Sequence, residues 1–296
     1  MSGEICIFGE VLFDHFPDGR RVLGGAPFNV AWNLSAFGED PRLISRVGTD
    51  GNALSVRSAM QVWGMDTADL QSGAEAPTGL VQVTFDAGEP AYDIIHPAAW
   101  DAIAPPDPPP DCGLLYHGSL ALRSAVSRAT LQGLRAARPG AVFVDVNLRA
   151  PWWQREVVRA LLDGADWVKL NDEELDRLAP AGEGREARAR ALMAQHGVAH
   201  LLLTGGSRGA AVFTAGGERF ATRPVERIEV VDTVGAGDAF SSVMILGITR
   251  GWPLQLSLDR AQQFASAVVG QRGATVHDRA FYRPFLEAWG ADPGAG

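Results

Sequence analysis

The chain has 296 residues, of which 46% are hydrophobic and 21% charged, and its formal net charge is −9. This length suits one large α/β domain with enough chain for a substantial core. The acidic balance, 26 basic against 35 acidic residues, argues against broad electrostatic binding to nucleic acid or to an anionic membrane. No apolar run approaches the roughly 20 residues that span a bilayer, and the first residues lack the pattern of a cleavable leader. We therefore expect a soluble cytoplasmic protein.

Lysine is almost absent from this sequence. Lys169 is the only lysine, so no P-loop lysine follows a glycine-rich turn. Phosphate would have to be bound by arginine, backbone amides, a helix terminus or a metal. Lys169 itself lies at the end of a predicted strand. Its side chain is either exposed to solvent or functional, and the sequence does not favour one interpretation over the other.

The cysteine content is also low. Cys6 and Cys112 both lie among apolar residues. Two cysteines in a cytoplasmic chain predict neither a disulfide framework nor a structural zinc site.

The first elements in chain order are short strands and helices. A strand is predicted over residues 5–8, and helical spacing over residues 27–37 begins with a proline, which suits a first turn. After a second strand over residues 43–47, Asp50 is a typical N-cap of a helix that ends near Gly64.

The next region breaks this pattern. Residues 78–86 and 90–95 read as two β segments around a turn, which indicates an insertion and not a βα unit. We expect a single domain over residues 1–296 with a small β lid formed by segments at about 10–23 and 78–103.

From residue 112 onward, apolar strands and helices alternate. The predicted strands are 114–117, 142–146, 167–170 and 201–204, and the predicted helices are 124–137, 152–162 and 185–196. This rhythm is typical of an α/β fold with a parallel sheet that helices cover on both faces.

A predicted strand at 228–231 leads through a glycine turn into an apolar helical run. A chain that turns through Gly235, Ala236 and Gly237 into a helix leaves backbone N–H groups pointing one way, and with the helix dipole they form an anion site. Asp238 then lies beside the anion in the first helical turn. We expect this carboxylate to be stabilised in its ionised form and to be a weak base, which phosphoryl transfer tolerates. A helix cap and a plain turn explain the same residues.

Two segments carry a family resemblance. Asp232-Thr-Val-Gly-Ala-Gly-Asp-Ala-Phe240 resembles the C-terminal signature of ribokinase-like (PfkB-type) carbohydrate kinases. Gly24-Gly-Ala-Pro-Phe-Asn-Val-Ala31 resembles their N-terminal signature in the form common among fructokinases. The similarity extends to Asp145-Val-Asn-Leu-Arg149 and Asn171-Asp-Glu-Glu174. The resemblance implies that Asp238 is the catalytic base and that Gly235, Ala236, Gly237 and Asp238 form the anion hole for the transferred phosphate.

The resemblance also implies a sugar site at Asp14, Gly25 and Asn29. Carboxylate and amide groups suit a polyol because each can pair with neighbouring hydroxyls. From the residues alone, a solvated loop acid at Asp14 and a satisfied helix amide at Asn29 are the alternatives.

The nucleotide end is expected where two later strands end. Asn171 and Glu174 follow a strand at the sheet edge where α/β proteins bind ligands. The resemblance implies that they organise magnesium, largely through water, and phosphate; an ordinary acidic helix start is the alternative. The turn after the next strand resembles the family's nucleotide-binding turn, so Thr204, Gly206 and Gly209 are candidates for the ATP site. A hairpin explains these glycines without a ligand.

Further charges complete the expected site. Arg149, at a strand end, is the natural cation for the transferring phosphate. The resemblance implies metal contacts at Glu174 and Asp232, with a monovalent cation such as K⁺ near Asp232, and pairing of two copies through their lids.

These patterns predict an ATP-dependent sugar kinase that phosphorylates a primary hydroxyl of a small monosaccharide, most simply fructose, with Mg²⁺ as cofactor. The same scaffold suits 2-keto-3-deoxygluconate, a nucleoside or a sugar phosphate. An anionic substrate should need a cation near the sugar end, where Arg20 and Arg21 are the obvious lid candidates. A non-catalytic sugar-binding regulator is the alternative from another class, and the intact Gly-Ala-Gly-Asp turn speaks against it.

Overall fold

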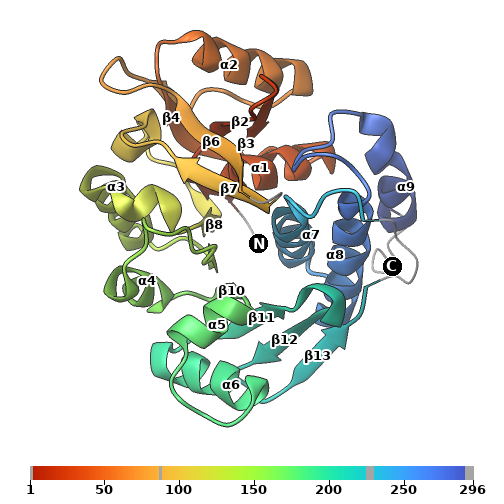
Figure 1. Cartoon of the computed structure of the whole chain (residues 1–296). Helices are drawn as coiled ribbons and strands as arrows, with labels where there is room; N and C mark the ends of the chain where they lie inside the picture. Colours follow the sequence, from red (N-terminus) through yellow and green to blue (C-terminus); the bar gives the residue numbers. More distant parts are fainter. Residues whose placement is uncertain (1–2, 87–88, 225–229, 291–296) are drawn as a thin grey trace.

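The computed structural model describes residues 3–86, 89–224 and 230–290 (Figure 1). Within these ranges the strands form a nine-stranded sheet, the large sheet, and a four-stranded sheet, the small sheet. The strands of the large sheet, in spatial order, are β13 (Arg219–Thr222), β12 (Ala210–Thr214), β11 (His200–Thr204), β10 (Trp167–Asn171), β9 (Val142–Asp145), β8 (Cys112–His117), β1 (Glu4–Phe8), β4 (Arg42–Val47) and β5 (Leu70–Ser72).

The large sheet is parallel from β5 to β11, and β12 and β13 add an antiparallel edge. Alternate residues of each strand face opposite cores. Ile7 and Tyr116 belong to one hydrophobic cluster, and Phe8 and Leu115 to the other. Because parallel strands are buried on both faces, they read as continuous apolar runs. The predicted α/β class is confirmed.

Helices cover both faces of the large sheet (Figure 1). One face carries α1 (Ala26–Ala36), α2 (Gly51–Trp63), α7 (Ala236–Arg250), α8 (Leu254–Val269) and α9 (Arg279–Gly290). The other carries α3 (Ala125–Ala136), α4 (Arg155–Leu162), α5 (Asp172–Leu178) and α6 (Arg185–His196). Local signals determine several ends. The Asp50 side chain accepts a hydrogen bond from the Ala53 N–H at the start of α2, and Gly64 ends this helix in the left-handed conformation.

The small sheet consists of β3 (Arg21–Gly24), β2 (Leu12–His15), β6 (Gly79–Asp86) and β7 (Glu89–Ile94) in that order. β2 pairs with β3 in antiparallel and with β6 in parallel orientation, which joins two segments that are distant in the chain. The predicted association of residues 10–23 with the later β insertion is thus observed. Its action as a lid stays a prediction.

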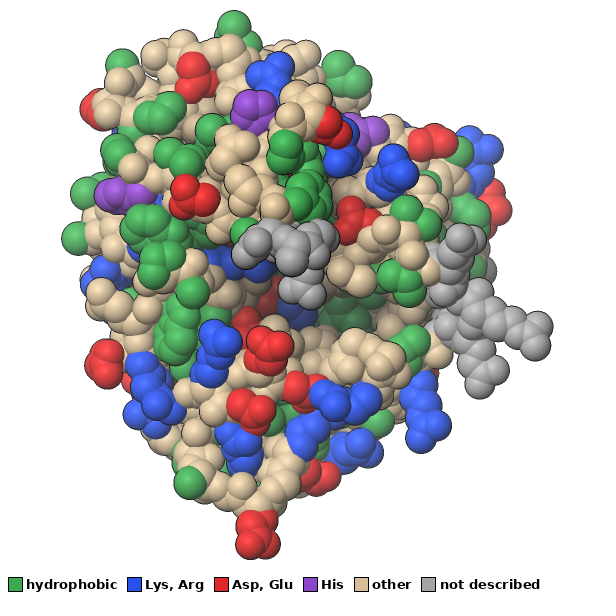
Figure 2. All heavy atoms as spheres, viewed as in Figure 1, with side chains coloured by type: hydrophobic (Ala, Val, Ile, Leu, Met, Phe, Trp, Pro, Cys, Tyr) green, Lys and Arg blue, Asp and Glu red, His purple; other side chains and the backbone are tan. Residues whose placement is uncertain are grey.

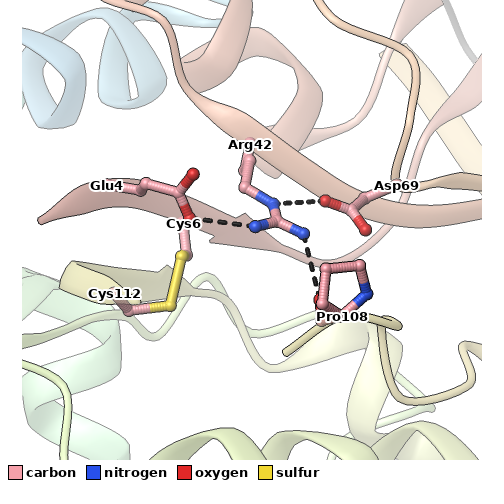
Figure 3. The surroundings of a disulfide bond; sticks show 6 residues. All are labelled: Glu4, Cys6, Arg42, Asp69, Pro108 and Cys112. Carbon is pink, nitrogen blue, oxygen red and sulfur yellow. Dashed lines mark hydrogen bonds and ion pairs between the residues drawn. A yellow bond between two sulfur atoms is a disulfide. The ribbon is translucent and has the colours of Figure 1, made fainter. Parts of the chain in front are cut away.

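The structure contradicts the expectation for the cysteines. Cys6 and Cys112 form a disulfide with their Cα atoms 5.7 Å apart, across a sequence separation of 106 residues (Figure 3). The physical reason is strand pairing, since β1 and β8 are neighbours in the large sheet. Sequence spacing does not reveal which strands are adjacent.

One further expectation concerns a region at the limit of the described chain. The predicted strand at 228–231 includes Ile228 and Glu229, which lie outside the described residues, while Val230 and Val231 belong to no strand. The short strands β5 and β13 were not predicted. In the described ranges, no helix has the length and apolar character needed to cross a membrane.

Candidate active site

A cavity of about 370 Å³ lies between the small sheet and the carboxyl ends of the large-sheet strands. The small sheet contributes Leu12, Asp14, Gly24, Val81, Tyr92 and Ile94 to its walls. The rest of the molecule contributes, among others, Glu10, Gly25, Asn29, Asp145, Asn147, Arg149, Lys169, Asn171, Glu174, Thr204, Gly235, Gly237 and Asp238. Figure 2 shows the molecular surface hollowed near its centre, with acidic and basic side chains inside. Ligands of open α/β sheets bind at this edge.

The glycine turn leads into α7 as predicted. Gly235 is the N-cap of α7 with φ +80°, and a Cβ atom there would overlap Ala274. Only glycine fits this left-handed and crowded position. Gly237 and Asp238 follow in the first helical turn and line the cavity. The unpaired N–H groups of the helix start therefore lie at the cavity wall.

Asn29 and Asp238 meet at the cavity wall. The Nδ2 atom of Asn29 donates a hydrogen bond to Oδ2 of Asp238 over 2.7 Å. Asn29 is 4% exposed, and its Oδ1 atom has no hydrogen-bond partner among the described residues. Gly25 precedes α1 with φ +108°, and a Cβ atom there would lie 2.7 Å from the Glu10 carbonyl oxygen. The structure thus brings Asp14, Gly25, Asn29 and Asp238 into one cavity.

The expected acidity of Asp238 is wrong. Its side chain faces the cavity and is otherwise surrounded by protein, and this burial raises the pKa of Asp238 to about 6. The Asn29 hydrogen bond, Lys169 and Arg149 act in the opposite direction but do not prevail. Burial likewise raises the pKa of Asp14 to about 6. Desolvation thus outweighs the hydrogen bond and the nearby cations, and Asp238 is a stronger base than its position in the helix suggests.

Glu10 is a cavity residue that sequence reasoning missed. It is 3% exposed, and burial raises its pKa to about 7, with the charge of Asp238 acting in the same direction. A possible signal was its place just beyond β1, at the carboxyl edge of the sheet.

Lys169 is buried, so the interpretation that it is solvated is wrong. Its Nζ atom donates to both carboxylate oxygens of Asp145, over 2.9 and 2.7 Å, and Ser241 donates to Oδ2 of the same carboxylate over 2.8 Å. A Cβ atom on Gly237 would lie 3.2 Å from Nζ. Burial lowers the pKa of Lys169, but Asp145 more than offsets this and leaves it raised. The ammonium group of Lys169 therefore lies against the glycine turn before α7.

Asn171 and Glu174 form a capping box at the start of α5. The Oδ1 atom of Asn171 accepts from the Glu174 N–H over 2.9 Å, and the Glu174 carboxylate accepts from the N–H groups of Asn171 and Leu148 over 2.8 and 2.7 Å. Both side chains also line the cavity. Asn171 and Glu174 therefore cap α5 and also lie where a ligand in the cavity could approach them.

The remaining candidates differ in whether they line the cavity. Thr204 does. The other four are not among the described residues of its wall: Gly206, Gly209, Asp232 and Ala236. The absence of a side chain at Gly209 leaves room for the carbonyl oxygen of the adjacent β13 strand, which fits the hairpin explanation. The Asp232 carboxylate accepts from two backbone N–H groups, those of residues 234 and 273, and so holds the loop before α7.

Comparison with known proteins agrees with this geometry. Residues 6–279 match the description pfkB family carbohydrate kinase. The chain is 33% identical to a fructokinase of Klebsiella pneumoniae over 266 residues, which covers 84% of this chain and 85% of that protein. It is 29% identical to the aminoimidazole riboside kinase of Salmonella typhimurium over 263 residues, or 83% and 81% of the two chains.

A solved structure shows the same architecture. The crystal structure of aminoimidazole riboside kinase from Salmonella enterica, complexed with aminoimidazole riboside and an ATP analog, matches with a TM-score of 0.83 at 25% identity, covering 96% of this chain and 99% of that one. The parallel α/β sheet with a glycine turn at its carboxyl edge thus matches the architecture of a small-molecule kinase. The chain belongs to the pfkB family of carbohydrate kinases and is an ATP-dependent sugar kinase.

Proposed function

We propose that this kinase transfers the γ-phosphoryl group of ATP to a primary hydroxyl of a neutral monosaccharide, with fructose as the first candidate. The observation that carries the proposal is the Asn29–Asp238 hydrogen bond of 2.7 Å. It joins the N-terminal turn of α1, beside the small sheet, to the first turn of α7. A hydroxyl held by Asn29 therefore lies next to a base and an anion site at once.

The residues then divide the reaction between them. Asp14 and Oδ1 of Asn29 accept hydrogen bonds from sugar hydroxyls, and Asp238 takes the proton of the attacking hydroxyl as the new oxygen–phosphorus bond forms and the bond to ADP breaks. Lys169, Arg149 and the N–H groups at the start of α7 stabilise charge on the moving phosphoryl group. The ion pair with Asp145 holds Lys169 in place before the reaction, which limits the reorganisation that would oppose it.

ATP would lie toward Asn171, Glu174 and Thr204. Among the described residues, no group of three or more His, Cys, Asp or Glu side chains is placed to hold a metal ion. This fits Mg²⁺, which usually keeps several waters and binds one or two carboxylates plus substrate phosphates. Both oxygens of Glu174 already accept backbone N–H groups, so Glu174 would reach the ion through water. When bound, the ion neutralises phosphate charge. A K⁺ ion near Asp232 stays a prediction.

Charge in the cavity favours a neutral substrate. Glu10, Asp14 and Asp238 line its sugar end. Arg20 pairs with Asp18 and Arg21 donates to Asn52, and neither arginine is among the cavity residues. An anionic sugar would therefore meet carboxylates without the lid cation it needs. This argues against 2-keto-3-deoxygluconate and sugar phosphates.

A nucleoside is the second candidate. Tyr92 on β7 lines the cavity and offers an aromatic face on which a heterocycle can stack. Similarity to both a fructokinase and an aminoimidazole riboside kinase supports testing both substrate classes. Fructose comes first because the fructokinase has the higher identity.

The small sheet has a role in this proposal. Its strands β2, β6 and β7 form one wall of the cavity, so it would exclude water and limit wasteful ATP hydrolysis. In this view residues 1–296 act as one kinase domain with an inserted lid. Pairing of two copies through the small sheet stays a prediction.

A substrate panel tests the proposal. ADP release would be measured with ATP and MgCl₂ for fructose, glucose, ribose, aminoimidazole riboside, 2-keto-3-deoxygluconate and fructose 6-phosphate. We expect fructose to have the highest kcat/KM and the anionic sugars to lie about tenfold or more below it, because they meet the carboxylates of the sugar end and the described residues of the small sheet supply no cation to the cavity. The highest kcat/KM on an anionic sugar, or no turnover of any substrate, would contradict the proposal.

A further inference from the structure

Arg123 lies buried between two tryptophan rings. It ends the short 3₁₀ helix η2 (Leu120–Arg123), and its side chain is 3% exposed. Its guanidinium carbon lies 4.0 Å from the ring centroid of Trp100 and 4.4 Å from that of Trp152. Nε and Nη2 donate to the two carboxylate oxygens of Asp101 over 2.7 and 2.8 Å. A bidentate ion pair, made by a cation that also lies over aromatic rings, uses the forked donor geometry of arginine, which lysine lacks.

Arg123 and the residues that surround it, Trp100, Asp101 and Trp152, form a cluster, and one side of this cluster contacts the small sheet. Nη2 of Arg123 also donates over 3.1 Å to the carbonyl oxygen of Ile95, the residue that directly follows β7. Trp100 and Asp101 belong to η1 (Ala99–Ala102), and a Cβ atom on Gly79, the first residue of β6, would overlap the indole of Trp100. The guanidinium therefore anchors the ends of both strands of the β6–β7 hairpin.

The other side holds the turn that carries Arg149. The backbone N–H of Trp152 donates to the Arg149 carbonyl oxygen over 2.8 Å, and this hydrogen bond closes the turn. His96 stacks on Trp152 with ring centroids 5.2 Å apart. The Arg149 side chain lines the cavity and makes no hydrogen bond or ion pair within the described part of the chain. Its position therefore depends on its backbone, and the backbone turn depends on the packing of Trp152.

We propose that Arg123 is a positioning residue for phosphoryl transfer: through Trp152 it holds the turn that carries Arg149, and through Asp101 and Ile95 it ties that turn to the small sheet. This inference rests on the role of Arg149 in the proposed function. Arg123 is not among the described residues that line the cavity, so its effect on phosphoryl transfer arises from where it places Arg149. A small misplacement of a group that stabilises the transition state can cost as much as about 100-fold in rate.

The test compares Arg149→Met, Arg123→Met, Trp152→Leu and the double variant Arg123→Met/Arg149→Met with the whole enzyme, on the substrate that the enzyme turns over fastest. We expect Arg149→Met to lower kcat about 100-fold, as removal of one transition-state donor does. Arg123→Met and Trp152→Leu should lower kcat about tenfold or more, with little change in KM for the sugar. The double variant should be no slower than Arg149→Met alone, because Arg123 acts through Arg149.

Two controls separate positioning from stability. Arg123→Met leaves the buried Asp101 unpaired and is expected to lower the melting temperature, whereas Trp152→Leu changes a partly exposed ring and keeps the ion pair. Arg42→Met removes another partly buried arginine, which donates to Asp69, Glu4 and the Pro108 carbonyl beside the disulfide (Figure 3). It should lower the melting temperature and leave kcat unchanged.

The outcomes separate this inference from the proposed function. Additive losses in the double variant, or wild-type turnover in Trp152→Leu together with a loss in Arg149→Met, would overturn the positioning role alone. Wild-type turnover in Arg149→Met would overturn the role of Arg149 in the proposed function and the inference with it.

Discussion

The phosphate end and the sugar end of the cavity hold their charges in different ways. At the phosphate end, Lys169, Asp145 and Ser241 form a buried network in which each polar group has a partner. At the sugar end, Glu10 and Asp14 form no ion pair within the described residues, and Oδ1 of Asn29 has no partner there. The Lys169–Asp145–Ser241 network is complete without a ligand, whereas Oδ1 of Asn29 is left as an acceptor without a donor among the described residues.

This difference follows from what each end must do. A charge that stabilises a transition state acts best when the protein holds it in place before the reaction, and the Asp145 carboxylate does this for Lys169. Buried acceptors without partners are costly, and a sugar hydroxyl removes that cost when it donates to them. Under the proposed function, the sugar end would gain selectivity from Oδ1 of Asn29, which has no partner among the described residues until a substrate hydroxyl donates to it.

The largest effect is expected from Asp238→Asn, which removes the base where the two ends meet. The amide keeps the size of the side chain but cannot accept the hydroxyl proton, so kcat should fall about a thousandfold. Calorimetric titration should show ATP binding largely intact. Asp172→Asn, on α5 and outside the cavity wall, serves as the control and should lose little. Near-normal turnover of Asp238→Asn would rule out its assignment as the base.

Lys169→Met tests the phosphate end. We expect kcat to fall about 100-fold, because a positioned charge beside the glycine turn is lost. The variant also leaves the Asp145 carboxylate buried and unpaired, so its melting temperature should fall. In the double variant Asp145→Asn/Lys169→Met, the melting temperature should recover while kcat stays low. Recovery of kcat as well would mean that the ion pair serves only stability.

Glu10→Gln tests the sugar end through the free energy of unfolding. The folded pKa of Glu10 is raised to about 7, above its ordinary value, so the unfolded chain releases this proton first and wild-type stability falls as the pH rises through this window. Glutamine does not ionise. The stability of Glu10→Gln relative to wild type should therefore grow by about 2 kcal/mol between pH 5 and pH 7, as measured by urea unfolding.

A matched control is available on the surface. Glu173 on α5 has a side chain that is 84% exposed, and Glu173→Gln should show no such growth. A stability difference between Glu10→Gln and wild type that stays constant over this pH range would show that Glu10 is not the buried acid described here.

The smallest effect concerns the pH dependence of turnover. Burial raises the pKa of Asp238 to about 6, and only the ionised carboxylate accepts the hydroxyl proton. Below this pH, kcat/KM should fall about tenfold per pH unit, while it should level off above it. In Asp238→Asn, the residual rate should lose this acidic limb. Its persistence in that variant would assign the limb to another group, such as Asp14.

Much of the fold was predictable because its signals are local. Apolar runs predicted the central strands, and Asp50 and Gly64 marked the ends of α2 correctly. The strands β5 and β13 escaped prediction because they lie at the two edges of the large sheet and are only partly buried, so they lack the apolar runs of the central strands. The Cys6–Cys112 disulfide escaped it because pairing between β1 and β8 is not written in the spacing of the cysteines.

The site was predictable to the extent that it is made of turns and helix starts. The glycine turn could be placed because glycine has specific conformational properties at a helix start, whereas Asn29 was placed by the family resemblance. Lys169 and Glu10 could not be placed, since nothing local distinguishes a buried ammonium or carboxyl group from a solvated one. The pKa of Asp238 was wrong for the same reason, because it depends on burial by distant segments.

The sequence by itself determined that this acidic chain with one lysine would build an α/β sheet and a glycine turn that leads into a helix start. Both follow from short-range rules of hydrophobic periodicity and glycine conformation. Only the tertiary structure decided that the one lysine would lie against that turn, that the two cysteines would meet, and that Arg123 would connect the small sheet to the Arg149 turn. Burial and electrostatic pairing depend on which segments come together in space, and no local pattern specifies that.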